Sequence, residues 1–170
     1  MKTENNIENE VQKLFNSLPI QKGIQMIIKE SNQNFEYGIT FSGFGNHEVW
    51  YTELNEFQYI DSPTKKIKLE LSQDSKEKSK NCYNTSLRIF YENEEIMMEE
   101  FFKIKEKFEE LGDKVDTETV MTEDYIMKSQ IVIIYFKKGK EIPNLAFSFL
   151  KEEQFDEYQV FVNYQNCLNK

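Results

Sequence analysis

His47 is the only histidine in this sequence, and Glu48 follows it directly. Histidine is the residue type whose ordinary pKa lies nearest neutral pH. An imidazole beside a carboxylate is a common arrangement in general acid–base catalysis. On a β-strand, however, successive side chains point to opposite faces, so these two cannot act on each other. A catalytic pair needs a distant carboxylate, and a metal site needs further ligands that the local spacing does not supply. We expect a surface or turn histidine.

Cys82 and Cys167 are far apart in the sequence, and neither belongs to a CxxC motif. Because this is neither a metal or redox spacing nor a dense disulfide framework, we expect two reduced thiols. Gly43-Phe44-Gly45 lacks the other glycines and the Lys-Ser/Thr pair of a phosphate loop, and no G-x-S-x-G motif occurs. The sequence therefore predicts no catalytic residue, no metal, no cofactor and no enzyme, with a small enzyme left open as an alternative.

The chain is acidic, with 30 Asp and Glu against 21 Lys and Arg and a formal net charge of −9. A negative surface repels the phosphates of DNA and RNA, so we predict no direct nucleic-acid binding. It suits a basic protein partner, while the alternative is that the charge serves solubility alone. The start, MKTENNIENE, lacks a signal-peptide core, and the longest apolar run, Ile131 to Phe136, is too short to cross a bilayer. We expect no membrane association and a cytoplasmic location.

Two segments combine aromatic and acidic residues and are candidates for a protein-binding surface. Trp50, the single tryptophan, lies between Glu48 and Tyr51, and tryptophan and tyrosine are typical interface anchors. The second segment is the acidic tract 152–158. The predicted partner-binding residues are Glu48, Trp50, Tyr51, Glu152, Glu153, Phe155, Asp156 and Glu157. The alternatives are that Trp50 belongs to the core and that the tract is a solvated loop.

The first half of the chain reads as a helix followed by strands. Apolar residues from Ile7 to Leu18 have helical spacing, and Pro19 ends that helix. The run 24–28 predicts a short strand. From 35 to 42 every odd position is apolar, which predicts a strand with one wet face, and a turn at 43–46 returns the chain through 47–54 as a hairpin.

A further strand, 66–71, precedes the polar stretch 72–81, which we expect to be a mobile loop. Leu87, Ile89 and Tyr91 resume the strand alternation. The strongest helix prediction is 94–111, whose apolar stripe is Met97, Phe101, Ile104, Phe108 and Leu111. Asn93 is its expected N-cap and Gly112 its expected C′ residue.

Strands are predicted at 115–121, 130–136, 145–150 and 158–165. Because 131–134 is apolar on both faces, we expect that strand to be central in the sheet and covered by a helix. The 170 residues suit one domain spanning 1–170. The predicted fold is α+β: one or more antiparallel meander sheets, with an N-terminal helix and a central amphipathic helix packed on the sheet. Whether the two halves are a duplication stays open.

This order of elements resembles that of small acidic bacterial toxin-immunity proteins and phage inhibitors of host defence. The resemblance rests on the first helix, the hairpin from Phe35 to Leu54, the 94–111 helix, and a meander containing Tyr135-Phe136-Lys137-Lys138-Gly139-Lys140. It implies stoichiometric inhibition of a toxin or defence effector through surface complementarity, and it assigns no site residue.

The alternative function is a small-ligand module with an aromatic pocket between sheet and helix. The oligomeric state stays open.

Overall fold

The computed structural model describes residues 9–42, 45–56, 58–59, 63–74, 82–111, 114–122, 127–135, 145–152 and 157–167. Residues 9–14 are helical and are called the N-terminal helix here. The other elements are α2 (Ile24–Ser31), β1 (Glu36–Ser42), β2 (Gly45–Leu54), β3 (Lys66–Asp74), β4 (Cys82–Tyr91), α3 (Glu94–Leu111), β5 (Lys114–Thr122), β6 (Met127–Tyr135), β7 (Leu145–Glu152) and β8 (Glu157–Cys167). The α+β prediction is confirmed.

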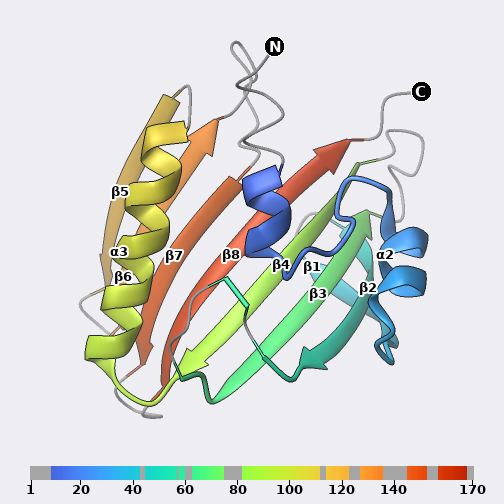
Figure 1. The fold of residues 1–170 in the computed structure, drawn as a ribbon, viewed down its shortest axis with the longest axis horizontal. Coiled ribbons are helices and arrows are strands. Elements are labelled where there is room, and N and C mark those ends of the chain that lie inside the picture. Colours follow the sequence, from blue (N-terminus) through green and yellow to red (C-terminus); the bar gives the residue numbers. More distant parts are fainter. Residues whose placement is uncertain are drawn as a thin grey trace.

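All eight strands form one antiparallel sheet in the order β1-β2-β3-β4-β8-β7-β6-β5. Each half of the chain is a helical segment followed by a four-stranded meander, and the two halves join where β4 pairs with β8 (Figure 1). The last strand of each meander therefore lies at the centre of the sheet, and the first strands, β1 and β5, form its two edges. This symmetry of connection is the form that a duplication of a helix-plus-meander unit would take.

The core lies between the sheet and the helices, which lie over one face of the sheet (Figure 1). Because side chains alternate along a strand, one set from each central strand points to this face. The core side chains of the central strands include Ile67, Leu69, Leu71, Leu87, Ile89, Val160 and Val162. Those of the helices include Val11, Leu14, Ile24, Ile27, Met97, Phe101, Ile104 and Phe108. We call this the helix-bearing face and the other the open face.

Helix α3 matches its prediction from 94 to 111. Asn93 is its N-cap, since its side-chain oxygen accepts a hydrogen bond from the backbone N–H of Ile96 at 3.0 Å. The predicted stripe is buried through Phe108, and the Phe101 ring lies 5.0 Å from that of Phe149 on β7. The expected C′ residue, Gly112, lies outside the described residues. No helix in the described ranges is long and apolar enough to span a membrane.

The strand predicted at 24–28 is wrong, because Ile24–Ser31 is helix α2. Ile24 and Ile27 are buried, and their spacing of three suits a helix. The apolar run was too short for its periodicity to distinguish a helix from a strand. The tertiary structure selects the helix: the backbone N–H of Gly23, its N-cap, donates to the buried Tyr83 hydroxyl at 3.0 Å.

Two further expectations need correction. Strand β6, predicted to be central, is second from the β5 edge, although α3 does pack over it. A two-sided apolar run is typical of buried strands, but it does not encode which strands pair. The expected loop 72–81 begins later than predicted, because β3 continues to Asp74. Residues 75–81 lie outside the described residues.

Candidate partner-binding surface

The β1–β2 hairpin forms one edge of the sheet and carries the first predicted segment. The hairpin prediction is confirmed, with Tyr37 opposite Trp50 and Ile39 opposite Glu48. Residues directly opposite each other in an antiparallel pair point to the same face. Tyr37, Ile39 and Phe41 of β1 therefore share the helix-bearing face with Glu48 and Trp50 of β2.

Tyr37, Ile39 and Phe41 are 55%, 54% and 80% exposed, and we call them the apolar row. The alternation in this segment predicted a strand with one wet face, which implied that its apolar side lay in the core. That implication is wrong for β1, because no β1 residue belongs to the buried cluster in the described ranges. The helices bury their side chains against inner strands, and sequence periodicity alone cannot tell an edge strand from an inner one.

Trp50 links this row to the core. It is half-buried and packs against the edge of the core cluster, while its ring centroid lies 5.4 Å from that of Tyr37. Trp50 therefore belongs in part to the core, and its role as an interface anchor stays a prediction.

Glu48 places a negative charge within this surface. It is opposite Ile39, and the Tyr37 hydroxyl donates a hydrogen bond to its Oε1 at 3.3 Å. An apolar row with a carboxylate beside its centre offers both contact area and a site for a cation.

Tyr51 does not join this cluster. Strand alternation turns it to the open face, where it is 44% exposed. A hydrogen bond with the Glu36 carboxylate raises the pKa of Tyr51 above its ordinary value. The predicted group of Glu48, Trp50 and Tyr51 is thus divided between the two faces.

The described residues of the predicted acidic tract lie elsewhere on the molecule. Glu152 and Glu157 pair across the β7–β8 connection, and Glu157 is exposed. The other three residues, Glu153, Phe155 and Asp156, lie outside the described residues.

The strand ladder sets the distance between the two predicted segments. Trp50 is opposite Leu71, and that row continues through Thr85 to Tyr164 on β8. At about 4.8 Å per strand and 3.3 Å per residue, Trp50 and Glu157 are roughly 25 Å apart along the sheet. They also point to opposite faces, so Trp50 and Glu157 do not lie on one surface.

His47 lies in β2 on the open face, between Thr40 of β1 and Asp74 of β3. It is half-buried, and the strand separates it from Glu48 as predicted. Across the described ranges, no three His, Cys, Asp or Glu side chains gather as a metal site would require.

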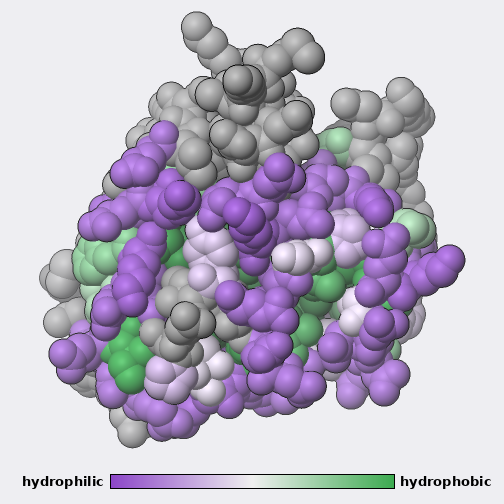
Figure 2. All heavy atoms as spheres, in the orientation of Figure 1, coloured by the Kyte–Doolittle hydropathy of each residue, from purple (hydrophilic) through white to green (hydrophobic). Residues whose placement is uncertain are grey.

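A cleft of about 500 Å³ lies between the N-terminal helix and α3, and most of its lining residues have charged or polar side chains. It is lined by Glu10, Lys13, Ser17, Gln58, Tyr59, Lys103 and Lys107. The Tyr59 hydroxyl donates to Glu10 at 3.0 Å, and burial raises the pKa of Tyr59. The Lys103 ammonium is held by Glu99 at 3.0 Å and by the buried Glu100 at 3.3 Å. Figure 2 views the helix-bearing side of the molecule and shows mostly hydrophilic residues over that side.

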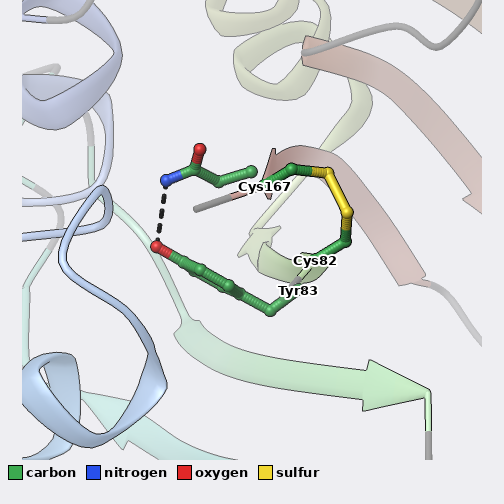
Figure 3. The surroundings of a disulfide bond; sticks show 4 residues. Cys82, Tyr83 and Cys167 are labelled. Carbon is green, nitrogen blue, oxygen red and sulfur yellow. Dashed lines mark hydrogen bonds between the residues drawn. A yellow bond between two sulfur atoms is a disulfide. The ribbon is translucent and has the colours of Figure 1, made fainter. Parts of the chain in front are cut away.

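The expectation of two reduced thiols is wrong, because Cys82 and Cys167 form a disulfide (Figure 3). The β4–β8 register places them directly opposite each other, with Cα atoms 4.0 Å apart. Sequence spacing could not reveal this, since the residues are 85 positions apart and meet only when the two meanders join.

A polar cluster lies directly beside the disulfide. Tyr83 Oη donates to the carbonyl of Ile20. The same oxygen accepts a hydrogen bond from Asn166 Nδ2 at 3.0 Å (Figure 3). The same hydroxyl accepts the N–H of Gly23. The disulfide therefore joins β4 and β8, and the neighbouring residues Tyr83 and Asn166 of these strands hold the segment between the N-terminal helix and α2.

Comparisons of this chain with protein-family models, curated proteins and solved structures gave no significant match.

Proposed function

We propose that this protein acts by binding another protein, as a non-enzymatic inhibitor of the toxin-immunity or anti-defence type, and that its partner presents a basic surface. The observation that carries the proposal is the apolar row Tyr37, Ile39 and Phe41 beside Glu48 and Trp50. The row is more than half exposed on the helix-bearing face of an edge hairpin.

A row of large apolar side chains in water is unfavourable unless a partner covers it, at about 25 cal/mol per Å² of apolar area. Contiguous exposed apolar groups with a polar rim are typical of protein–protein contact sites. Aromatic rings at the centre of such a site contribute most to affinity, so Phe41 and Trp50 are the expected anchors.

The net charge of −9 supports a basic partner. Electrostatic complementarity accelerates encounter, whereas desolvated aromatic contacts slow dissociation. Glu157 lies roughly 25 Å from Trp50, so its carboxylate contributes to a steering field and Glu48 acts in the contact itself.

The ligand-module alternative required an aromatic pocket between sheet and helix. The 500 Å³ cleft is lined mainly by charged and polar side chains, so it lends that alternative little support. His47, the natural residue for the enzyme alternative, lies on the open face, away from the apolar row and from the residues that line the cleft.

A cytoplasmic location belongs to this proposal, and the disulfide bears on it. Disulfides persist mainly in oxidising compartments. In a reducing cytoplasm, cellular reductants would act on the disulfide between Cys82 and Cys167. Alkylation of free thiols at lysis, followed by measurement of the protein's mass, shows directly whether the two cysteines are bonded or reduced in the cell.

The test of function uses the purified chain as bait in its native lysate, followed by identification of the partner and kinetic measurement with that partner. Phe41→Ser should raise the dissociation rate by about 10- to 100-fold, as expected for loss of an aromatic anchor. Phe102→Ser, which removes an equally large ring 43% exposed on α3, is the matched control and should leave binding unchanged. Equal dissociation rates for wild type and Phe41→Ser, or no captured macromolecule, would reject the proposal.

A further inference from the structure

We propose that two copies of this chain pair through their β1 strands, antiparallel and about a two-fold axis at Ile39, to continue the sheet across the dimer. The inference is independent of the proposed function, because it concerns the backbone edge of β1 and requires no other protein.

In the described part of the chain, β1 is a sheet edge that no further strand covers. It is the last strand on its side of the sheet, so half of its backbone N–H and C=O groups point away from β2. Natural edge strands are usually blunted by lysine, proline or inward charges. The seven residues Glu36–Ser42 contain no lysine and no proline, and their single charge, Glu36, is at the end. The opposite edge, β5, carries Lys114, Asp116 and Glu118.

The β1 sequence also complements itself. An antiparallel pair centred on Ile39 places Ile39 opposite Ile39 of the second copy. Moving outward, Gly38 meets Thr40, and then Tyr37 meets Phe41. Small residues thus face small ones, and aromatic rings face aromatic rings, a favourable cross-strand combination. Glu36 meets Ser42, so no like charges are opposed.

The carboxylates of Glu36 and Glu48 do not oppose this contact. Glu48 lies one strand behind Ile39, so three strand spacings, about 14 Å, separate it from Glu48 of the second copy. The two Glu36 residues are six positions apart along the ladder, about 20 Å. Both separations exceed the Debye length of about 8 Å at physiological salt, so these repulsions are largely screened.

Pairing would merge the two apolar rows into one continuous stripe on the helix-bearing face, flanked by Glu48 of each copy. Since a seven-residue strand contact is at the small end of interface sizes, we expect a dissociation constant on the order of 10 µM.

Sedimentation velocity of the purified chain, from about 1 to 500 µM around the expected dissociation constant, tests the proposal. We expect a monomer–dimer equilibrium for the wild type. Ile39→Lys places a positive charge opposite itself at the axis and should leave only monomer. Phe102→Lys makes the same type of change on α3, and should keep the wild-type dissociation constant.

The register is tested by cysteine cross-linking under mild oxidation. Neither native cysteine is free, so an introduced cysteine is the only thiol. Ile39→Cys lies opposite itself and should form a covalent dimer on a non-reducing gel. Ser42→Cys lies about 20 Å from its copy and should cross-link far more slowly.

A wild type that stays monomeric at the highest concentration overturns the proposal. So does association that Ile39→Lys leaves intact, because the contact would then lie elsewhere. Equal cross-linking of Ile39→Cys and Ser42→Cys refutes the two-fold register. Circular dichroism and thermal unfolding of each variant confirm that a monomer is a folded monomer. None of these results depends on whether an inhibited partner exists.

Discussion

At the scale of single residues, the structural roles that matter most belong to side chains that carry no motif. Cys82 and Tyr83 are neighbours on β4, yet their side chains point to opposite faces. The cysteine bonds β4 to β8 on the open face, and the tyrosine holds the N-terminal segment on the helix-bearing face. One dipeptide therefore connects three parts of the chain.

Reduction of the Cys82–Cys167 disulfide should lower the free energy of unfolding by about 2–4 kcal/mol. The bond constrains a long loop in the unfolded chain, with a separation of 85 residues. Urea denaturation with and without a reductant measures the change. The double variant Cys82→Ala, Cys167→Ala is the control and should be as unstable as the reduced wild type in both buffers. A midpoint unaffected by reductant in the wild type would contradict the prediction.

Tyr91 supplies a pH-dependent term. Burial, reinforced by the charge of Glu100, raises the pKa of Tyr91 above its ordinary value of 10.0. Above pH 10 the unfolded chain loses this proton while the folded protein keeps it, so stability falls as the pH rises. Tyr91→Phe should lose less stability on the alkaline side, by up to about 1.4 kcal/mol per pH unit. Parallel stability–pH curves for the two proteins would mean that Tyr91 does not contribute.

Tyr91→Phe has a second expected effect at neutral pH. Its hydroxyl is buried with no hydrogen-bond partner in the described part of the chain. Because a buried hydroxyl without a partner is unfavourable by about 1–3 kcal/mol, the variant should be at least as stable as the wild type at pH 7. Urea denaturation at that pH gives the comparison.

At the scale of elements, α3 and the β1–β2 hairpin show how the same kind of apolar pattern has two outcomes. The stripe of α3 lies over the central strands and β7, and it is buried from Met97 through Phe108. The row of β1 has an equally regular pattern but lies beyond the cover of the helices. Position in the sheet, and not the pattern, determines which of the two is core.

Phe101 and Phe102 provide a matched test of this point because they are adjacent on α3. Phe101 is fully buried, whereas Phe102 is 43% exposed. Phe101→Ala should lower the free energy of unfolding by about 3–5 kcal/mol through lost burial and a residual cavity. Phe102→Ala should change it by less than about 1 kcal/mol. Similar losses for both variants in urea denaturation would mean that the stripe is not the core face.

At the scale of the whole molecule, the net charge and the apolar row are expected to act at different steps of binding. The field of a −9 protein extends beyond contact range, while the row acts only on contact.

Raising the salt concentration from about 0.05 to 0.5 M should therefore slow association with the inhibited partner several-fold and leave dissociation nearly unchanged. Charge reversal of Glu152 and Glu157 should lower the association rate and reduce its salt dependence. Trp50→Ala should mainly raise the dissociation rate. Stopped-flow association and surface-based dissociation measurements separate the two. An association rate that is constant over this range would mean that the charge serves solubility alone.

The sequence by itself determined the features that depend on neighbouring residues. The hairpin follows from alternation on either side of a glycine turn, and α3 follows from its stripe and the Asn93 cap. Local periodicity carries this information because a helix forms its backbone hydrogen bonds within itself, and a hairpin forms them between two adjacent strands. The α+β class and the strand pattern of the second half were predictable for the same reason.

Only the tertiary structure decided what depends on pairing between distant segments. The β4–β8 junction brings Cys82 to Cys167, places β1 and β6 at or near the edges, and supplies the Tyr83 contacts that accompany helix α2. It also divides the predicted site, with Tyr51 turned to the open face and Glu157 about 25 Å from Trp50. Strand order is set by the burial of apolar side chains over the whole assembled sheet. The free energy of this burial cannot be assigned to any single segment of the sequence.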